Sequence, residues 1–437
     1  MTETTSIAHA RLSGAAVRPL HTLDPAAPLD DLEWLDDAIG DARVVAIGES
    51  AHYNRESYRL RHRLTRYLVE RHGFSGYALE PGFTEAWPTD AWVRGTTDID
   101  QLGPLMGNGM VQLMLMWTEM RAHLEWMRQY NRTAARPVGF YGVDLGGSNV
   151  SLLPGLDAVA AYLAEADPEF DVDSKIRQTA ASFAPPSPLS APAAIETYGR
   201  LATETRDALT AGLAQLAARM SGRRLDYVRR TTVDDYERAM RTLRLTITLD
   251  SVVRAMADGD LQTVMCNRDA AMADTVEWLL HREDRIVVAA HNGHIQRWPT
   301  TQPWPPGTPM GMHLADRIGD DYRVIGTTTG TGHTLNTDPD FYTGKIFTDL
   351  EPLRPGSLDA LMHASHDGPF ATDLRRLSPA DTATVRATTN QRYGTVYLDQ
   401  NPLDAYDILV HLPHVTAAEP DQDALTHSPD DVQKAFS

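Results

Sequence analysis

The sequence contains a single cysteine, Cys266, and no long apolar run. One cysteine can neither form an internal disulfide nor supply a zinc–thiolate cluster, which favours a reducing compartment. No stretch approaches the roughly 18 apolar residues of a membrane span. Residues 1–20 lack the basic-then-apolar pattern of a secretory signal peptide. We therefore expect a cytoplasmic protein.

Positive charge is also scarce, because 40 basic residues stand against 59 acidic ones and the net charge is −19. This excess of negative charge argues against nucleic acid and anionic membranes as partners. Only three of the basic residues are lysine, a bias typical of high-GC bacterial genomes such as those of actinobacteria. Apolar residues make up 42% and charged residues 23%, as in ordinary soluble globular proteins, and 437 residues suffice for one large domain or two.

Strand and helix patterns alternate over much of the chain. Helical spacing occurs at 32–39, 56–72, 268–281 and 312–318. Apolar runs typical of strands occur at 43–48, 76–79, 138–143, 285–290, 322–327, 394–398 and 407–412. This alternation implies right-handed parallel crossovers. It predicts an α/β fold with a mostly parallel central sheet flanked by helices.

One long stretch departs from the alternation, because helical spacing over 197–220 and 233–256 occurs without strand patterns and follows a Pro-rich segment at 184–192. We interpret it as an inserted, all-helical cap that lies over the site and sets substrate size. The predicted organisation is a loose lead-in (1–30), a first part of the α/β core (31–150), the helical cap (151–260), a second part of the core (261–418) and a flexible acidic tail (419–437).

Four predicted strands end in an ionisable residue: Glu49, Glu80, Asp144 and His291. A carboxylate after one strand is often only a helix cap. In open α/β sheets, however, ligands bind beyond the carboxyl ends of the strands, so four such residues favour an active site. The first of these turns, Gly48-Glu49-x-x-His52, places a glutamate and a histidine three residues apart.

With these residues, the chain resembles the erythromycin esterase family over about residues 30–415. The resemblance rests on the following motifs: Gly48-Glu49-x-x-His52, Arg61-His62, Ala78-Leu79-Glu80 with Glu85, Trp126-Met127-Arg128-x-Tyr130-Asn131, Phe140-Tyr141-Gly142-x-Asp144, Asn267-Arg268-Asp269-x-x-Met272-Ala273, Ala290-His291-Asn292-Gly293-His294, Met310-Gly311, Gly319-Asp320-Asp321-Tyr322 and Tyr406-Asp407. It implies an α/β fold with a helical cap and metal-independent hydrolysis of a macrolide lactone. The site residues that it implies are Glu49, His52, Arg61, Glu80, His291 and His294, with His52 as the base that activates water.

Ester hydrolysis by direct water attack needs a base, a group that orients the base, and donors for the oxyanion. His52 is the natural base, and Glu49 or Glu80 could fix its tautomer. Arg61 falls about two turns into the next helix, where it could clamp a glutamate or polarise a carbonyl. His291 could act as a second base or an oxyanion donor. His294, three residues later, is interpreted as a substrate contact or a packing residue.

Rival chemistries are less favoured. The acids and histidines at the strand ends suit zinc or manganese by ligand type, but no dense ligand motif such as H-E-x-x-H is present, so we expect no metal and no other cofactor. No G-x-S-x-G elbow occurs, and Ser50 stands in no recognisable triad order. The segment 326–332 is rich in glycine and threonine but lacks the P-loop lysine, so we predict a rim loop there.

The region around residues 106–117 is rich in methionine and tryptophan. Helix core is the slightly favoured explanation. The alternative is an adaptable apolar wall for a large substrate, which Trp87, Trp92 and Trp304 could extend. On this alternative, Asn108, Met110 and Trp117, together with Asp144, would contact the substrate.

The leading hypothesis is a hydrolase that acts on an ester or macrolactone of a bulky polyketide-like compound, in antibiotic resistance or secondary metabolism. The first alternative is a biosynthetic tailoring enzyme that uses the same residues for acyl transfer, elimination or cyclisation. The second is a binding protein with a degenerate site, against which four ionisable groups at strand ends argue. The expected partner is a bulky small molecule, and the chain is expected to be a monomer or a homodimer.

Overall fold

The computed structural model describes residues 10–107 and 113–436. The chain divides into two units, each assembled from separate stretches of sequence. The first unit comprises Met1–Phe74, Arg285–Asp338 and Ile346–Glu419, and the second comprises Ser75–Asp284, Pro339–Lys345 and Pro420–Ser437. The residues between 151 and 260 therefore share one unit with the strands expected at 76–79 and 138–143.

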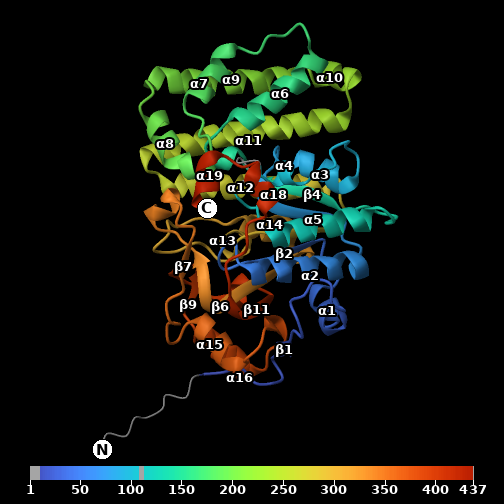
Figure 1. The fold of residues 1–437 in the computed structure, drawn as a ribbon, viewed down its shortest axis with the longest axis vertical. Coiled ribbons are helices and arrows are strands. Elements are labelled where there is room, and N and C mark those ends of the chain that lie inside the picture. The colour runs from blue at the N-terminus through green and yellow to red at the C-terminus, as the bar shows by residue number, and fades with distance from the viewer. Residues whose placement is uncertain (1–9, 108–112, 437) are drawn as a thin grey trace, which may run out of the picture. The chain divides into compact units, whose positions relative to one another are not determined.

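The first unit is built on a mixed, mostly parallel sheet with the strand order β1-β8-β11-β6-β2-β5 (Figure 1). The parallel strands are β11 (Ile408–Val415), β6 (Tyr322–Leu335), β2 (Val44–Ile47) and β5 (Ile286–Ala289). Antiparallel pairing adds β8 (Phe370–Asp373) to β11, β1 (Arg18–Pro19) to β8 and β7 (Phe347–Asp349) to β6, while β9 (Asn390–Tyr393) and β10 (Val396–Asp399) form a separate hairpin. β2 and β5 are buried at every residue, as expected of apolar parallel strands. The predicted α/β fold class is confirmed.

Helices of the first unit follow the strands in sequence. They are α1 (Leu35–Ile39), α2 (Arg55–His72), α13 (Asn292–Ile295), α14 (Met310–Ile318), α15 (Leu358–Ser365), α16 (Pro379–Arg386) and α17 (Pro402–Ala405). The leucine stripe of α2, Leu60, Leu64 and Leu68, is buried. The helix ends at Gly73, whose left-handed φ of 68° lets its N–H bond to the carbonyls of the last turn. The sequence pattern predicted this helix and its stop.

Residues 326–332, predicted to form a rim loop, lie inside β6. Three of their four threonines are buried, and the segment pairs in parallel with β11. The two strands are so close that a Cβ at Gly330 would lie 2.1 Å from the carbonyl oxygen of Pro413, and one at Gly332 would lie 1.8 Å from that of Val415. The loop prediction was wrong because it weighted glycine content above the strand preference of β-branched threonine and above the pairing partner.

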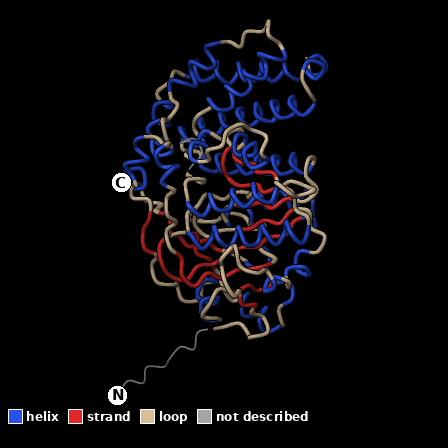
Figure 2. The backbone as a smooth tube through the Cα atoms, turned by 45° about the vertical axis from the view of Figure 1, so that its right-hand side comes forward, coloured by secondary structure: helices blue, strands red, loops and turns tan. Residues whose placement is uncertain are grey.

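The second unit combines two parallel strands with the helical part of the chain (Figure 2). β3 (Gly76–Gly82) pairs with β4 (Gly139–Asp144), and the register shifts between Leu79 and Gly82. Pro81 has no N–H to give to the ladder, which explains why the irregularity falls there. The helices are α3 (Trp87–Arg94), α4 (Gly103–Met106), α5 (Thr118–Asn131), α6 (Leu153–Ala166), α7 (Ser174–Ser182), α8 (Ala191–Gly199), α9 (Thr203–Gly222), α10 (Arg224–Arg230), α11 (Val233–Asp258) and α12 (Leu261–Leu280).

Residues 153–258, all of them described, contain helices and turns but no strand. α11 shows why the sequence folds this way. Its N-cap Thr232 accepts a hydrogen bond from the N–H of Asp235 at 3.1 Å, and it ends at Gly259 with φ 77°. Between these caps it buries a face that shares one hydrophobic core with α6 to α10.

The two segments interpreted as lead-in and tail contain regular structure in the described residues. β1 lies in the first of them, and the second forms α18 (Gln422–Thr426) and α19 (Asp430–Ala435). Asp421 caps α18 by accepting from the N–H of Ala424 at 2.9 Å, and it pairs with Arg121 at 2.6 Å. Such partners, hundreds of residues away, leave no trace in the local sequence pattern.

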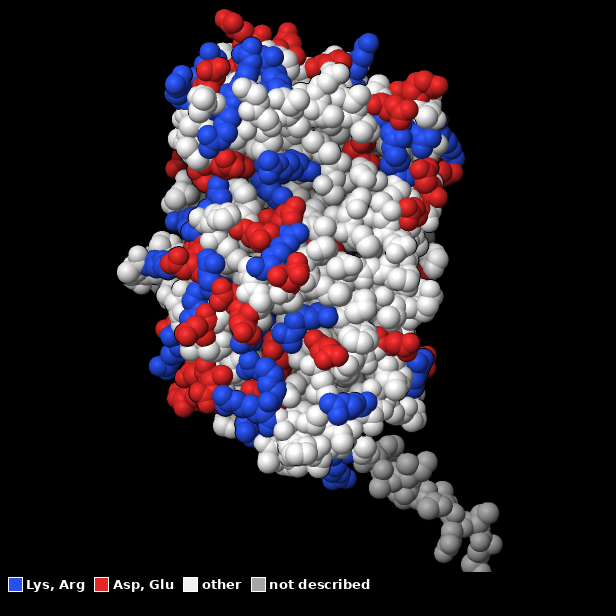
Figure 3. Space-filling view, turned by 180° about the vertical axis from the view of Figure 1, so that it is seen from behind, with Lys and Arg blue, Asp and Glu red and all other residues white. Residues whose placement is uncertain are grey.

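None of the described helices is long and apolar enough to cross a bilayer. Over part of the face drawn in Figure 3, basic and acidic side chains stand next to one another, and another broad part carries few charges. Many of the ion pairs are exposed, as between Arg177 and Asp157 or Arg200 and Glu196. Pairs of this kind each contribute little to stability.

Candidate active site

The turn after β2 begins with a glycine that the packing requires. A Cβ at Gly48 would lie 2.0 Å from Oδ1 of Asn292, the first residue of α13. The Asn292 side chain donates to the carbonyl of Thr327 at 2.8 Å and accepts from the N–H of the same residue at 3.1 Å. The turns after β2 and β5 are thereby joined to the middle of β6.

His52 is fixed by a short hydrogen bond within this turn. Its Nδ1 lies 2.6 Å from Oε1 of Glu49, whose side chain is 1% exposed, whereas His52 itself is 23% exposed. When Nδ1–H is donated to the carboxylate, the basic lone pair is on Nε2. Tyr53, the next residue, has a φ of 65°, a conformation that costs a non-glycine residue about 1 kcal/mol or more. Backbone strain of this kind collects at functional sites.

Arg61 completes the support of Glu49 from the second turn of α2. Its Nη1 lies 2.9 Å from Oε2 of Glu49, and its Nη2 donates to the carbonyl of Ala290 at 2.7 Å. Burial by itself raises the pKa of Glu49, but the charge of Arg61 and the hydrogen bond from His52 outweigh it, so this pKa lies below its ordinary value. Glu49 is therefore ionised at neutral pH, and the 1% exposed Arg61 acts as its clamp.

His291 follows β5 and binds backbone through both ring nitrogens. Nε2 lies 3.2 Å from the carbonyl of Ser50, and Nδ1 accepts from the N–H of Gly293 at 3.1 Å, which caps α13. Burial lowers the pKa of His291 well below its ordinary value, and nearby His52 and His294 lower it further. A neutral imidazole bonded in this way supports the turn that carries His52.

Aromatic rings pack around His291. The His291 ring centroid lies 5.3 Å from that of His52 and 5.4 Å from that of Tyr393. Trp304 stacks on Tyr393 at 5.7 Å with an interplanar angle of 14°. The Tyr393 hydroxyl donates to Gln296 at 2.5 Å. Burial raises the pKa of Tyr393 well above its ordinary value, so this hydroxyl stays protonated.

Glu80 belongs to the second unit, where it lies on the irregular part of β3. Its side chain is fully buried. Bulges occur next to active sites because they re-aim a side chain. The charges of Asp144, Glu80 and Asp269 raise the pKa of Arg268 against the opposing effect of burial, which places Glu80 in the same group of charges.

Asp144, predicted to contact the substrate, is instead engaged by its own unit. Its two carboxylate oxygens accept from Nε and Nη2 of Arg268 at 2.9 and 2.6 Å. They also accept from the N–H of Leu145 at 2.8 Å and from Asn149 at 3.1 Å. Asp144 is fully buried, whereas the Arg268 side chain is 23% exposed. The residue of this pair that can meet a ligand is therefore the arginine.

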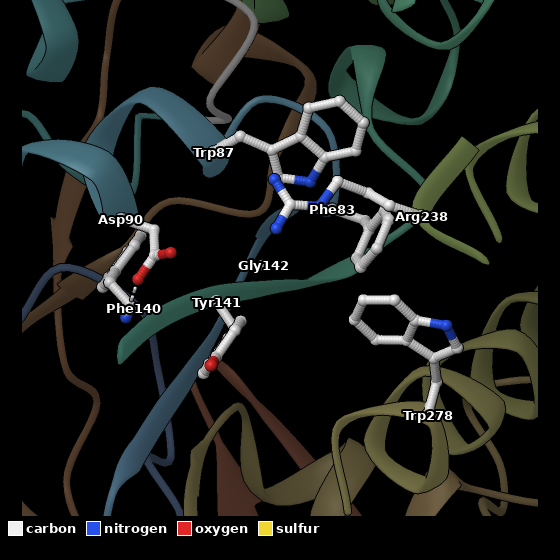
Figure 4. Close-up of a pocket in the computed structure, with 8 residues that line it drawn as sticks. All are labelled: Phe83, Trp87, Asp90, Phe140, Tyr141, Gly142, Arg238 and Trp278. Atoms are coloured by element: carbon white, nitrogen blue, oxygen red, sulfur yellow. Dashed lines mark hydrogen bonds between the residues drawn. The ribbon is translucent and has the colours of Figure 1, made fainter. Parts of the chain in front are cut away.

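The same unit contains a small aromatic pocket, drawn in Figure 4. The ring of Phe83 meets those of Trp87 and Trp278 edge-on at 5.8 and 5.1 Å. The Arg238 guanidinium lies against Trp87, 5.3 Å from the ring centre, and Asp90 accepts from the N–H of Phe140 at 2.8 Å. The remaining space is about 20 Å³, enough for one water-sized group. The guanidinium of Arg238 thus occupies one face of Trp87 at this pocket.

Trp117, also predicted to bind substrate, is a core residue. Its side chain is fully buried, and its ring meets that of Phe436 edge-on at 5.6 Å. The core interpretation of this methionine-rich region therefore holds at Trp117. Asn108 and Met110 lie outside the described residues.

Five of the predicted site residues come together in the first unit: Glu49, His52, Arg61, His291 and His294. Glu80 and Asp144 are placed with Arg268 in the second unit. The sequence did not reveal the positioning residue Asn292 or the ring of Tyr393, whereas Trp304 was already a candidate for an apolar wall. Asn292 was visible in the His291-Asn292-Gly293-His294 motif, but Tyr393 lies in a hairpin with no distinctive pattern.

An α/β sheet with a histidine–carboxylate pair at a strand end is an arrangement suited to hydrolysis. Sequence comparisons show to which class of hydrolases the chain belongs. The family model described as erythromycin esterase matches residues 69–415. The chain is 31% identical to erythromycin esterase type II of Escherichia coli over 327 residues, which cover 71% of this chain and 74% of that protein. It is 28% identical to the type I enzyme of Escherichia coli over 308 residues, which cover 68% and 73%.

The chain therefore belongs to the erythromycin esterase family of hydrolases, and the resemblance noted in the sequence is confirmed. Solved structures agree in fold. An erythromycin esterase variant in its open conformation superposes with a TM-score of 0.76 at 22% identity, covering 92% of this chain and 98% of that one. A Bacillus cereus protein gives a TM-score of 0.75 at 22% identity, covering 93% and 97%.

Proposed function

We propose that this protein hydrolyses an ester or macrolactone of a bulky polyketide-like compound by direct attack of water, with His52 as the general base. The observation that carries the proposal is the 2.6 Å contact between His52 Nδ1 and the buried, ionised Glu49. A carboxylate in this position fixes the imidazole tautomer and raises the basicity of Nε2. Nε2 of the part-exposed His52 then takes the proton from water as its oxygen attacks the ester carbonyl.

The remaining residues act on this pair or on the substrate. Arg61 keeps Glu49 ionised, and His291 holds the Ser50 carbonyl and so the turn. His294 is half-buried and lies in α13, the helix that His291 caps. We assign to it a hydrogen bond donated to the substrate carbonyl. Glu80 remains a proposed second carboxylate of the site. The part-exposed Trp304, stacked on the buried Tyr393, offers an apolar surface to a large substrate.

Neither a serine nucleophile nor a metal is part of the proposal. Ser50 is buried, and its hydroxyl lies 3.4 Å from that of Thr329. Both oxygens of Glu49 already meet nitrogen partners, and one of those partners is the permanently charged Arg61. A divalent cation at Glu49 would face this like charge, which supports a metal-independent reaction.

His52→Ala tests the proposal with a 14-membered macrolide lactone as substrate and mass spectrometry as the readout. The wild type is expected to give a product heavier by one water. The variant should be slower by about 10²–10⁴-fold, the usual cost of losing a general base. His333→Ala is the matched control, because His333 lies in the same unit and is half exposed.

Two results would count against the proposal. Activity of His52→Ala within about threefold of the wild type would remove His52 from the mechanism. A product of unchanged mass would indicate a rearrangement, and thus a biosynthetic tailoring enzyme of the same family.

A further inference from the structure

The helical part of the second unit contains a cavity that the proposed reaction does not use. It opens between α6, α7 and α9 and has a volume of about 360 Å³. Five aliphatic residues line it: Leu156, Ala160, Val172, Ile176 and Leu216. Polar residues at its edge are Asp173, Ser174, Arg177 and Gln178. An apolar lining with a few polar groups on one side is the composition of a small-molecule site.

The size of this cavity is not that of a packing defect. Protein interiors contain few voids larger than a water molecule, whereas ligand sites begin at about 300 Å³. The helices that form it are themselves closely packed nearby, since a Cβ at Gly212 of α9 would lie 2.8 Å from Ile176 of α7. Leu156, Ile176 and Leu216 also belong to the core of the helical region. The open space is therefore bounded by a well-packed frame.

The lining indicates the shape of the ligand. All five apolar lining residues are aliphatic, so nothing in the wall offers a ring to stack against an aromatic ligand. A cavity of about 150 Å³ holds a benzene molecule, so one of 360 Å³ holds about 14 carbon-sized atoms. A flexible aliphatic chain of about ten carbons with a small head group fills this space.

The polar edge indicates the charge of the head group. Arg177 pairs with Asp157 through Nε and Nη2, at 2.6 and 3.0 Å, and its Nη1 makes no hydrogen bond to a described residue. The positive end of the α7 dipole lies at the same edge, where Asp173 caps the helix by accepting from the N–H of Lys175 at 2.9 Å. Ser174 adds a hydroxyl donor. Asp157 and Asp173 already engage the rest of the guanidinium and the α7 N-terminus, so Arg177 Nη1 and the Ser174 hydroxyl are the donors left for an anionic head.

We propose that the cavity between α6, α7 and α9 binds a medium-chain aliphatic carboxylate, with the chain against Leu156, Ile176 and Leu216 and the carboxylate at Arg177 and Ser174. The site needs no residue of the first unit and does not depend on the esterase reaction. The proposal and the proposed function can therefore fail separately.

Isothermal titration of the full chain with decanoate tests this proposal. We expect saturable binding of one decanoate per chain. Hexanoate should bind weaker by about two orders of magnitude because it buries four fewer methylenes. Decanol should bind weaker by about tenfold, and decyltrimethylammonium, with the opposite charge, should not bind at the same concentration.

Matched variants locate the site. Ala160→Phe fills the cavity and should abolish binding, whereas Ala161→Phe, on the exposed side of the same helix, should leave it unchanged. Arg177→Gln should weaken decanoate about tenfold without affecting decanol. Arg200→Gln is its control, because Arg200 is an exposed arginine with an acidic partner in the same region.

Thermal melting of each variant shows whether it folds, and Val172→Phe at the cavity edge replaces Ala160→Phe if that variant melts early. Three results overturn the proposal. These are no saturable binding of decanoate, binding that survives the filling substitution in a folded variant, and equal binding of the carboxylate and the trimethylammonium compound.

Discussion

Glu49→Gln removes one negative charge from the centre of the site and leaves the size of the side chain unchanged. The structure predicts a loss of stability, because Arg61 is 1% exposed and would keep its charge without its carboxylate. Breaking a buried ion pair from one side costs about 3–5 kcal/mol. The pKa of Glu49 is lowered from its ordinary value of 4.5, so its contribution is present above that pH and is lost as the pH falls through the lower value of the folded protein. The free energy of unfolding of the variant should therefore fall less with decreasing pH in this range than that of the wild type.

The same substitution should reduce activity by a separate route. A glutamine at position 49 can present its amide to His52 Nδ1, which favours the tautomer with the proton on Nε2, where the base needs a lone pair. In comparable histidine–carboxylate pairs the carboxylate-to-amide change costs about 10⁴-fold in turnover. We expect kcat/KM to fall by about 10³–10⁴-fold while KM changes little.

The two effects can be separated with a second substitution. Glu49→Gln combined with Arg61→Met removes both buried charges, and it should regain most of the lost stability without regaining activity. Asp31→Asn is the control. Asp31 pairs at 2.5 Å with Arg63, which lies in α2 like Arg61, so this substitution should affect stability alone. Denaturant unfolding and initial rates are measured on the same samples. Recovery of activity in the double variant, or Glu49→Gln within about threefold of wild type, would refute this reasoning.

Three further predictions concern the metal, the pH and the second unit. Dialysis against a strong chelator should leave activity intact, and a loss reversed by one specific divalent ion would show metal dependence. Burial, with smaller effects from neighbouring charges, lowers the pKa of His62 and of His411 from 6.5 to about 3, so the unfolded chain takes up protons that the folded chain does not. Stability should therefore decline as the pH falls below about 6.5. The denaturant midpoint of His411→Gln should decline less steeply with falling pH than that of the wild type. An equally steep decline would contradict the lowered pKa of His411. Asp144→Asn should lower the free energy of unfolding by about 3 kcal/mol because Arg268 loses its two-point partner, and an unchanged midpoint would show that this pair is not structural.

The parts of the site that follow from the sequence are those set by local spacing. β2 and β5 are apolar runs bounded by polar residues, and the glutamate and histidine after β2 stand three residues apart, so one turn brings them together. The position of Arg61, about two turns into α2, follows from its spacing after His52 and the period of a helix. Each of these inferences needs only the period of a strand or a helix.

The parts that do not follow depend on partners distant in the chain. Asp144 and Arg268 are 124 residues apart, so sequence alone presented Asp144 as an available carboxylate. Trp304 and Tyr393 are 89 positions apart in the chain and stack on one another. The binding of both nitrogens of His291 to backbone could not be anticipated either, since a strand-end histidine is compatible with catalysis or with capping.

The central claim is that His52, oriented by Glu49, activates water for ester hydrolysis. The most direct measurement is product mass after reaction with a macrolide lactone in H₂¹⁸O, with the wild type and His52→Ala in parallel. We expect a ring-opened product from the wild type that carries one ¹⁸O in its new carboxylate, and almost none from the variant. An unlabelled product, or equal labelling by the two proteins, would contradict it.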